Sequence, residues 1–256
     1  MIQQTVTRLS ALVIAVGAIT GCAEEDEIVP LPAASTDHAA PWDPDTPYDP
    51  GLDVATLSPD ITNPLFPAPV GAKWVFEGQT EDGMEHVEIE VLAETKEVYG
   101  TTARVVRDTV YLEGELLEDT WDWYAQDPEG NVWYLGEETY EYENGEVLCD
   151  CGAWEGGVDG ALPGIAMLGS PKVGDAYREE FYAGEAEDIG EVVEVGISVT
   201  VAAGSFDGCI KTRELSAVER DVEEFKTWCP GVGVVLEETP ADDERGELIE
   251  SSGLEG

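Results

Sequence analysis

The chain has 256 residues, of which 43% are hydrophobic, enough to fill one sizeable core or two small ones, so disorder throughout is excluded. It carries 56 acidic against 12 basic residues, a formal net charge of −44. Such a surface repels phosphate backbones and anionic lipid headgroups, which excludes binding to nucleic acid and binding to a membrane through charge. Metal cations and basic partners are compatible with it.

The first 22 residues resemble a bacterial lipoprotein signal. Arg8 precedes an apolar run from Leu9 to Ile19, which is too short for a stable transmembrane helix. Residues 19–22, Ile-Thr-Gly-Cys, then place small residues before a cysteine, as in a lipobox. The alternative is an ordinary secretory signal cleaved near Gly21, which leaves Cys22 as a free thiol.

The lipoprotein resemblance implies that residues 1–21 are removed and that Cys22 becomes an acylated N-terminus, carrying chains such as palmitate. Each buried CH₂ of such a chain contributes about 0.8 kcal/mol, so several chains hold a protein stably at a bilayer. The expected location is therefore the cell envelope, with the lipid anchor as the only membrane contact. Because Ala23 is not Asp, the resemblance also implies outer-membrane sorting in a Gram-negative organism.

Residues 22–69 are predicted to form a disordered, acidic, proline-rich tether. Ten of the fifteen prolines lie here, and no Lys or Arg occurs between Arg8 and Lys73. Asp43, Asp45 and Asp49 have a spacing similar to that of a calcium loop, but the Gly and Glu of the EF-hand pattern are missing. Two interpretations are open: a weak calcium site, or a solvated linker.

Residues 70–151 are predicted to form a first antiparallel β unit. In the segment 86–94, apolar residues alternate with acidic ones, which predicts a strand with one core face and one wet face. Residues 116–139 are typical of a single hairpin, with turn residues at 127–131. Asn144-Gly145 is a preferred pair for a second tight hairpin.

Residues 173–250 are predicted to form a second β unit related to the first, after a glycine-rich connector at 152–172. The segment 218–239 repeats the order of polar start, aromatic strand, turn and apolar strand seen about one hundred residues earlier. Val173-Gly174 likewise corresponds to Val70-Gly71. We therefore expect an all-β fold, an antiparallel meander that closes into a barrel or a strongly curved sheet; the alternative is a two-sheet sandwich.

The globular part also resembles uncharacterised, acidic, secreted bacterial proteins rich in β-structure. The resemblance rests on DWYAQD at 122–127 and GNVWYLGE at 130–137. It implies the extent of the domain and no particular activity.

Four cysteines besides Cys22 are expected in an oxidising compartment. Cys209 and Cys229 lie on consecutive predicted strands with a turn centred near residue 219, so they are expected to face each other and to form a disulfide. Cys149 and Cys151 share one face of a short strand, where they can close a small ring or, alternatively, bind a soft metal.

Trp121, Trp123 and Trp133 are the candidate ligand contacts. Alternation puts Trp121 and Trp123 on the opposite strand face from Asp122 and Tyr124, and we expect the tryptophan face to be the inner one. On that face they either fill the core or line a binding site.

Catalysis is not expected. His38 and His86 are the two histidines of the chain, and no Ser or Cys has a base at a recognisable spacing. The first functional hypothesis is a binding module whose barrel interior or mouth holds a small apolar or amphipathic ligand. The second is a structural or interaction protein of the envelope, whose acidic surface binds cations or a basic partner. No cofactor is expected, apart from the weak calcium site.

Overall fold

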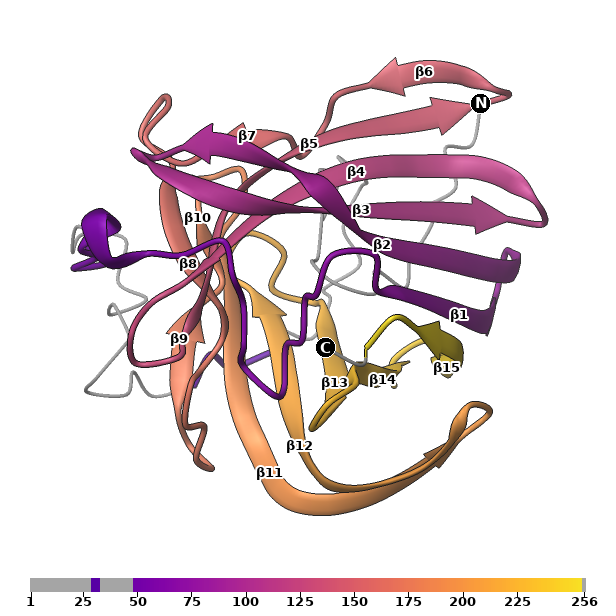
Figure 1. Ribbon diagram of the computed structural model, residues 1–256. Coiled ribbons are helices and arrows are strands. Elements are labelled where there is room, and N and C mark those ends of the chain that lie inside the picture. Colours follow the sequence, from indigo (N-terminus) through magenta and orange to yellow (C-terminus); the bar gives the residue numbers. More distant parts are fainter. Residues whose placement is uncertain (1–28, 33–47, 255–256) are drawn as a thin grey trace.

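The computed structural model describes residues 29–32 and 48–254, and this part of the chain is built from β-strands (Figure 1). One short 3-10 helix, Val54–Thr56, precedes them. The strands are β1 (Lys73–Thr80), β2 (Gly83–Val98), β3 (Thr101–Leu112), β4 (Glu115–Gln126), β5 (Val132–Glu143), β6 (Glu146–Cys149), β7 (Trp154–Glu155), β8 (Leu162–Met167), β9 (Ala176–Arg178), β10 (Glu180–Phe181), β11 (Asp188–Val201), β12 (Gly204–Ser216), β13 (Glu223–Cys229), β14 (Gly233–Thr239) and β15 (Glu244–Ser252). The prediction of an all-β fold is confirmed.

The strands form one antiparallel sheet that curves into a nearly closed barrel, not a two-sheet sandwich. Neighbours follow one another from β1 to β5 and from β11 to β15, and β1 pairs with β15. The remaining gap is bridged by β9 and β10, which lie on either side of Glu179: β9 pairs with β11, and β10 pairs with β8. In Figure 1 the strands curve around a common interior.

The two predicted β units share one local backbone feature, a glycine turn near the start of each. Gly71 and Gly174 both have positive φ, 86° and 90°, a conformation that glycine adopts without strain. Gly71 N–H donates to the carbonyl of Val91 at 2.8 Å, and Gly174 N–H donates to the carbonyl of Val192 at 2.9 Å. The long hairpins β2–β3 and β11–β12 follow these glycines, and each carries a register shift after the valine.

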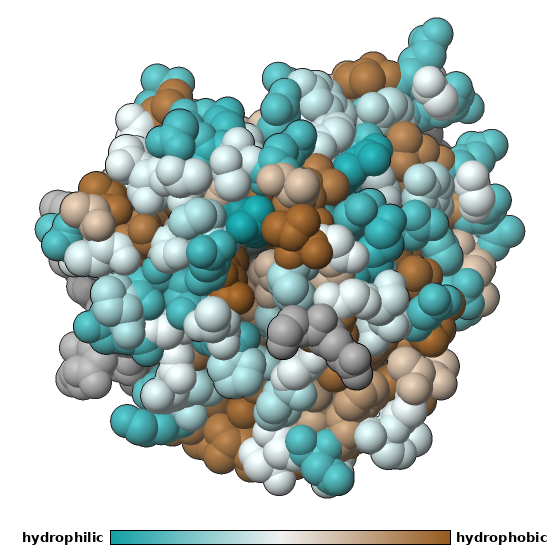
Figure 2. Space-filling view, viewed as in Figure 1, coloured by the Kyte–Doolittle hydropathy of each residue, from teal (hydrophilic) through white to brown (hydrophobic). Residues whose placement is uncertain are grey.

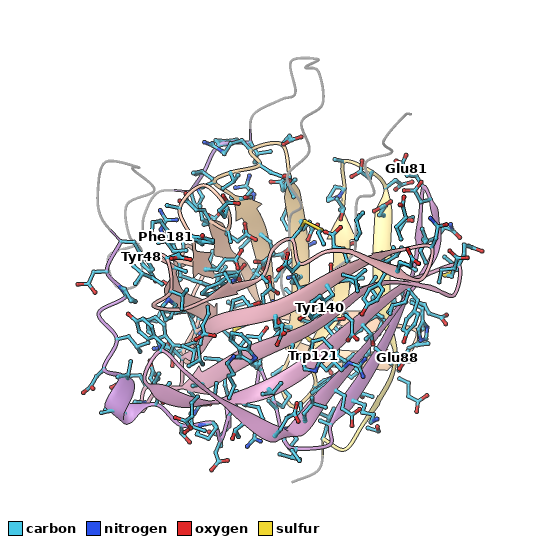
Figure 3. All side chains as sticks on the ribbon, turned by 90° about the horizontal axis from the view of Figure 1, so that it is seen from above. Tyr48, Glu81, Glu88, Trp121, Tyr140 and Phe181 are labelled. Carbon is cyan, nitrogen blue, oxygen red and sulfur yellow. A yellow bond between two sulfur atoms is a disulfide. The ribbon has the colours of Figure 1, made fainter. Side chains whose placement is uncertain are left out.

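The folded part begins well before Val70, where the sequence placed the end of the tether. Phe66 is 4% exposed and packs in the barrel core, with its ring 4.9 Å from that of Tyr124 and 6.0 Å from that of Trp228. Further upstream, Tyr48 packs on Phe181 at 5.3 Å, as Figure 3 shows, and its hydroxyl donates to a backbone carbonyl of β8. Proline-rich composition alone did not reveal these apolar anchors.

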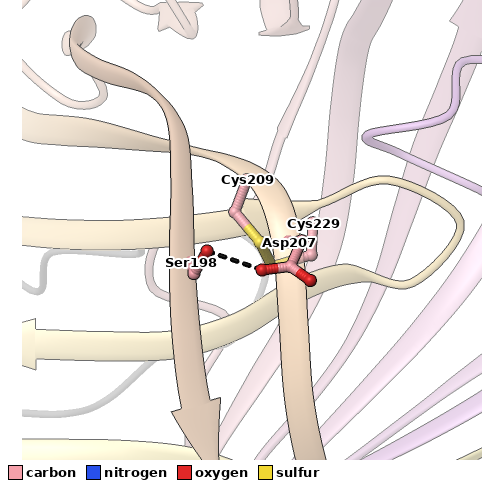
Figure 4. The surroundings of a disulfide bond; sticks show 4 residues. All are labelled: Ser198, Asp207, Cys209 and Cys229. Atoms are coloured by element: carbon pink, nitrogen blue, oxygen red, sulfur yellow. Dashed lines mark hydrogen bonds between the residues drawn. A yellow bond between two sulfur atoms is a disulfide. The ribbon is translucent and has the colours of Figure 1, made fainter.

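Both pairs of cysteines form disulfides. Cys209 and Cys229 face each other across β12 and β13 with their Cα atoms 4.2 Å apart, as predicted; beside them, Ser198 donates a hydrogen bond to Asp207 (Figure 4). Cys149 and Cys151 also pair, at the end of β6, which favours the small ring over a metal site.

No helix within residues 29–32 and 48–254 is long and apolar enough to cross a membrane. On the face seen in Figure 2, hydrophilic residues cover much of the surface, with separate hydrophobic patches between them.

Candidate functional site

The three candidate tryptophans lie on the outer face of the barrel wall, not in its interior as the sequence suggested. Trp123 and Trp133 pack in an outer cluster with Ala103 and Val105, whereas Tyr124, between them in sequence, belongs to the interior core. Trp133 Nε1–H donates to Asp127 at 2.9 Å.

Trp121 is half-buried on the same outer face. Its ring lies 5.2 Å from the guanidinium of Arg107 and 6.3 Å from the ring of Tyr140, which is labelled with it in Figure 3. Trp123 borders a cleft, which is described below.

The inner face of the barrel carries a set of buried acidic side chains, which we call the carboxyl belt. Each member is less than 10% exposed, and Lys226 lies among them, 2% exposed. The members are Glu85, Asp108, Glu118, Asp122, Glu137, Glu180, Asp188, Glu214, Glu224, Glu237 and Glu244. The sequence did not predict this belt, because acidic residues that alternate with apolar ones were expected on the solvent face. One signal in the sequence could have revealed it: Glu85 lies two and four residues before Val87 and Ile89, so all three side chains are on the same face of the strand.

Asp122 and Glu137 share one hydroxyl group inside the belt. Tyr134 Oη lies 2.9 Å from Asp122 Oδ1 and 2.9 Å from Glu137 Oε2. A tyrosine hydroxyl has one proton to donate, so both hydrogen bonds exist together only when one of the two carboxyls is protonated. Burial raises the pKa of Asp122 to about 7, with repulsion from Glu118 adding to the effect and the Tyr134 bond opposing it. Burial also raises the pKa of Glu137 well above its usual range, so this pair keeps a proton near neutral pH.

Lys226 is a buried positive charge among the belt carboxyls Glu214, Glu224 and Glu237. Burial by itself would lower the pKa of Lys226, but the surrounding Glu214 and Glu237 outweigh that effect and raise it. Lys226 therefore stays charged. Around it, burial raises the pKa of Asp188 and of Glu224 to about 7. The single positive charge of Lys226 cannot neutralise so many buried carboxylates. Several carboxyl groups of the belt are therefore protonated at neutral pH.

A cleft of about 370 Å³ lies where β7 pairs with β5. It is lined by Lys96, Trp123, Glu137, Glu138, Ala153, Trp154, Glu155, Val158, Asp159, Ala161 and Tyr182. We call it the β5/β7 cleft. Gly136 makes this pairing possible: its φ is 134°, and a Cβ there would lie 2.5 Å from the carbonyl oxygen of Trp154. Glu137 belongs to both the cleft and the carboxyl belt.

An ammonium group already occupies part of the cleft lining. Lys96 Nζ lies 4.1 Å from the centre of the Trp123 ring and 3.3 Å from Glu155 Oε2. The ring face and the carboxylate attract the same charge, one by cation–π interaction and the other by ion pairing. Glu138 and Asp159 add exposed carboxylates to the lining.

The apolar half of the barrel interior contains a much smaller cavity, of about 30 Å³, bordered by Phe66, Trp74 and Trp228. That is room for about one water molecule. This part of the interior is filled by side chains, so a small apolar ligand is not accommodated there in this conformation.

The remaining predicted site residues lie elsewhere. His86 sits on the outer face between Glu77 at 3.4 Å and Glu88 at 3.2 Å. Asp49 accepts a hydrogen bond from the backbone N–H of Gly51, whereas Asp43, Asp45, His38 and the whole lipobox lie outside the described residues. Within the described ranges, no three His, Cys, Asp or Glu residues are grouped so as to hold a metal ion.

No protein-family model matches the chain, and no curated protein matches it. The chain is similar to one solved structure, a protein from Parabacteroides distasonis ATCC 8503 that carries the provisional description of a lipoprotein. The two share 14% identity, with 73% of this chain and 98% of that one covered, at a TM-score of 0.41.

Proposed function

We propose that this protein is a lipid-anchored, non-catalytic binding module of the cell envelope that holds a small amphipathic ligand in the β5/β7 cleft. The observation that supports the proposal is the β5/β7 cleft. Its volume of about 370 Å³ falls within the range of about 300 to 1,000 Å³ typical of small-molecule sites. Its floor is aromatic, with Trp123 and Trp154 each 4% exposed, and its rim is charged. An apolar floor with a few polar groups suits a ligand with one apolar and one polar end.

The anchor is supported by the signal at residues 19–22, with Cys22 as the acylated residue and Ala23 favouring the outer membrane in a Gram-negative organism. The absence of catalysis is supported by the surroundings of His86. That imidazole is flanked by Glu77 and Glu88, with no Ser or Cys hydrogen-bonded to it among the described residues.

The proposal is tested by gentle extraction of the full-length protein from membranes, followed by native mass spectrometry. We expect a reproducible small-molecule adduct. Val158 borders the cleft and is 48% exposed, so Val158→Trp should fill the cleft without disturbing the core and should reduce adduct occupancy. Val173→Trp, at a 60% exposed position outside the cleft lining, is the matched control and should leave occupancy unchanged. An empty wild-type protein, or equal occupancy in both variants, would contradict the proposal.

A further inference from the structure

The β5/β7 cleft contains the elements of an ammonium-binding seat, made by Trp123 and Glu155. The indole ring of Trp123 presents one face to a cation 4.1 Å from its centre. Glu155 Oε2 lies 3.3 Å from that same cation. The chain's own Lys96 supplies the ammonium, so the structure itself shows which chemical group this position accepts.

The Lys96 ammonium is weakly held. The side chains of Lys96 and Glu155 are each 38% exposed, and ion pairs between exposed side chains contribute little to stability because water screens them and both chains lose freedom. Lys96 also sits on the rim, near the end of the long strand β2, from which a flexible four-carbon stem can swing into solvent. A competing cation can therefore take its place without unfolding any strand.

We infer that the ligand of this cleft is a small organic amine, whose ammonium group displaces Lys96 from the seat while its apolar body packs on Trp154. This inference rests on the proposed function and specifies its ligand class. The charge of the cleft favours a cationic ligand, because its lining includes the carboxylates of Glu138, Glu155 and Asp159 but one lysine, Lys96. An amine that is purely hydrophilic would leave the aromatic floor uncovered, and an anion would meet like charges.

The test uses three probes of similar size on the purified full-length chain: 2-phenylethylamine, 2-phenylethanol and phenylacetate. Binding is measured by isothermal titration, with detergent alone as the blank. We expect the amine to bind about tenfold more tightly than the alcohol, because it adds a cation–π contact and an ion pair, and phenylacetate to bind least. Added salt should weaken amine binding and leave alcohol binding unchanged.

Two substitutions distinguish an ammonium-binding site from an ion pair between Lys96 and Glu155 that is only structural. Glu155→Gln should weaken amine binding and spare the alcohol. Lys96→Met keeps an apolar stem over the ring but removes the competing ammonium, so it should tighten amine binding by up to about fivefold. Lys73 and Glu90 form another exposed ion pair, 2.9 Å apart on β1 and β2, and Lys73→Met and Glu90→Gln are the matched controls.

The outcomes distinguish this inference from the proposed function. If the amine and the alcohol bind equally and Val158→Trp abolishes both, the cleft is a binding site but the ammonium inference is overturned. If no probe binds while the native adduct persists, the inference is again overturned and the proposed function stands. If neither probe nor adduct is found, both are overturned. Weaker amine binding in Lys96→Met would also contradict the inference.

Discussion

Raising the pH should destabilise the barrel, and replacing Glu224 by glutamine should remove a defined part of that loss. Glu224 is 8% exposed, and burial raises its pKa from 4.5 to about 7, with Lys226 opposing the shift and Glu214 adding to it. A carboxyl with a higher pKa in the folded chain than in the unfolded chain holds its proton preferentially when folded. Its contribution to stability is complete below pH 4.5 and is lost as the pH rises through about 7.

The magnitude follows from the size of the shift. A shift of this size corresponds to a loss of about 3 kcal/mol once Glu224 is ionised. Asp122 and Asp188, whose pKa values burial also raises to about 7, lose their protons in the same window, so the wild-type protein should lose more than Glu224 alone accounts for. Since domains are typically stable by about 5 to 15 kcal/mol, this loss is readily measurable.

The assay is urea unfolding followed by tryptophan fluorescence at several pH values between about 5 and about 8. The unfolding free energy of the wild-type protein should fall with pH, and Glu224→Gln should flatten the curve by about 3 kcal/mol over the whole window. Glu250→Gln, at an exposed position of β15, should follow the wild-type curve. Parallel curves for wild type and Glu224→Gln would refute the account of the carboxyl belt.

Four further predictions concern other parts of the chain. Phe66→Ala removes a buried ring that packs on Tyr124 and should cost about 3 to 5 kcal/mol in urea unfolding; an unchanged midpoint would contradict the packing. Replacing Cys209 and Cys229 together by Ser opens a loop of 20 residues and should cost on the order of 3 kcal/mol, whereas a neutral result would count against the disulfide. The melting temperature should rise between about 10 mM and about 1 M salt, because screening relieves repulsion among the acidic residues, and a flat profile would oppose this. Cys22→Ser should abolish incorporation of an alkyne-labelled fatty acid in a bacterial host; persistent labelling would exclude the lipobox.

The residues by themselves determined the strand content and the antiparallel hairpins between strands that follow one another in the chain. Alternation with a period of two in segments such as 86–94, and turn residues such as Asn144-Gly145, are local properties that act wherever the chain is placed. The spacing of Cys209 and Cys229 about a turn was equally local, which is why their pairing was predictable.

Only the tertiary structure decided which face of each strand is the inner one. In β4 the sequence offers Trp123 on one face and Asp122 with Tyr124 on the other, and both faces are buried. The tryptophan face is covered from outside, in part by Leu57 of the segment before β1, which composition had assigned to the tether. The carboxyl face is tolerated inside because burial raises the pKa of carboxyls such as Asp122, so that retained protons neutralise much of the charge that Lys226 alone cannot compensate.

The cleft was hidden for the same physical reason. Lys96, Trp123 and Glu155 lie far apart in sequence, and they meet because β7 pairs with β5 across Gly136. Hydrophobic periodicity and strand propensity are properties of one sequence segment at a time. A site made of side chains from three strands depends instead on how the sheet closes.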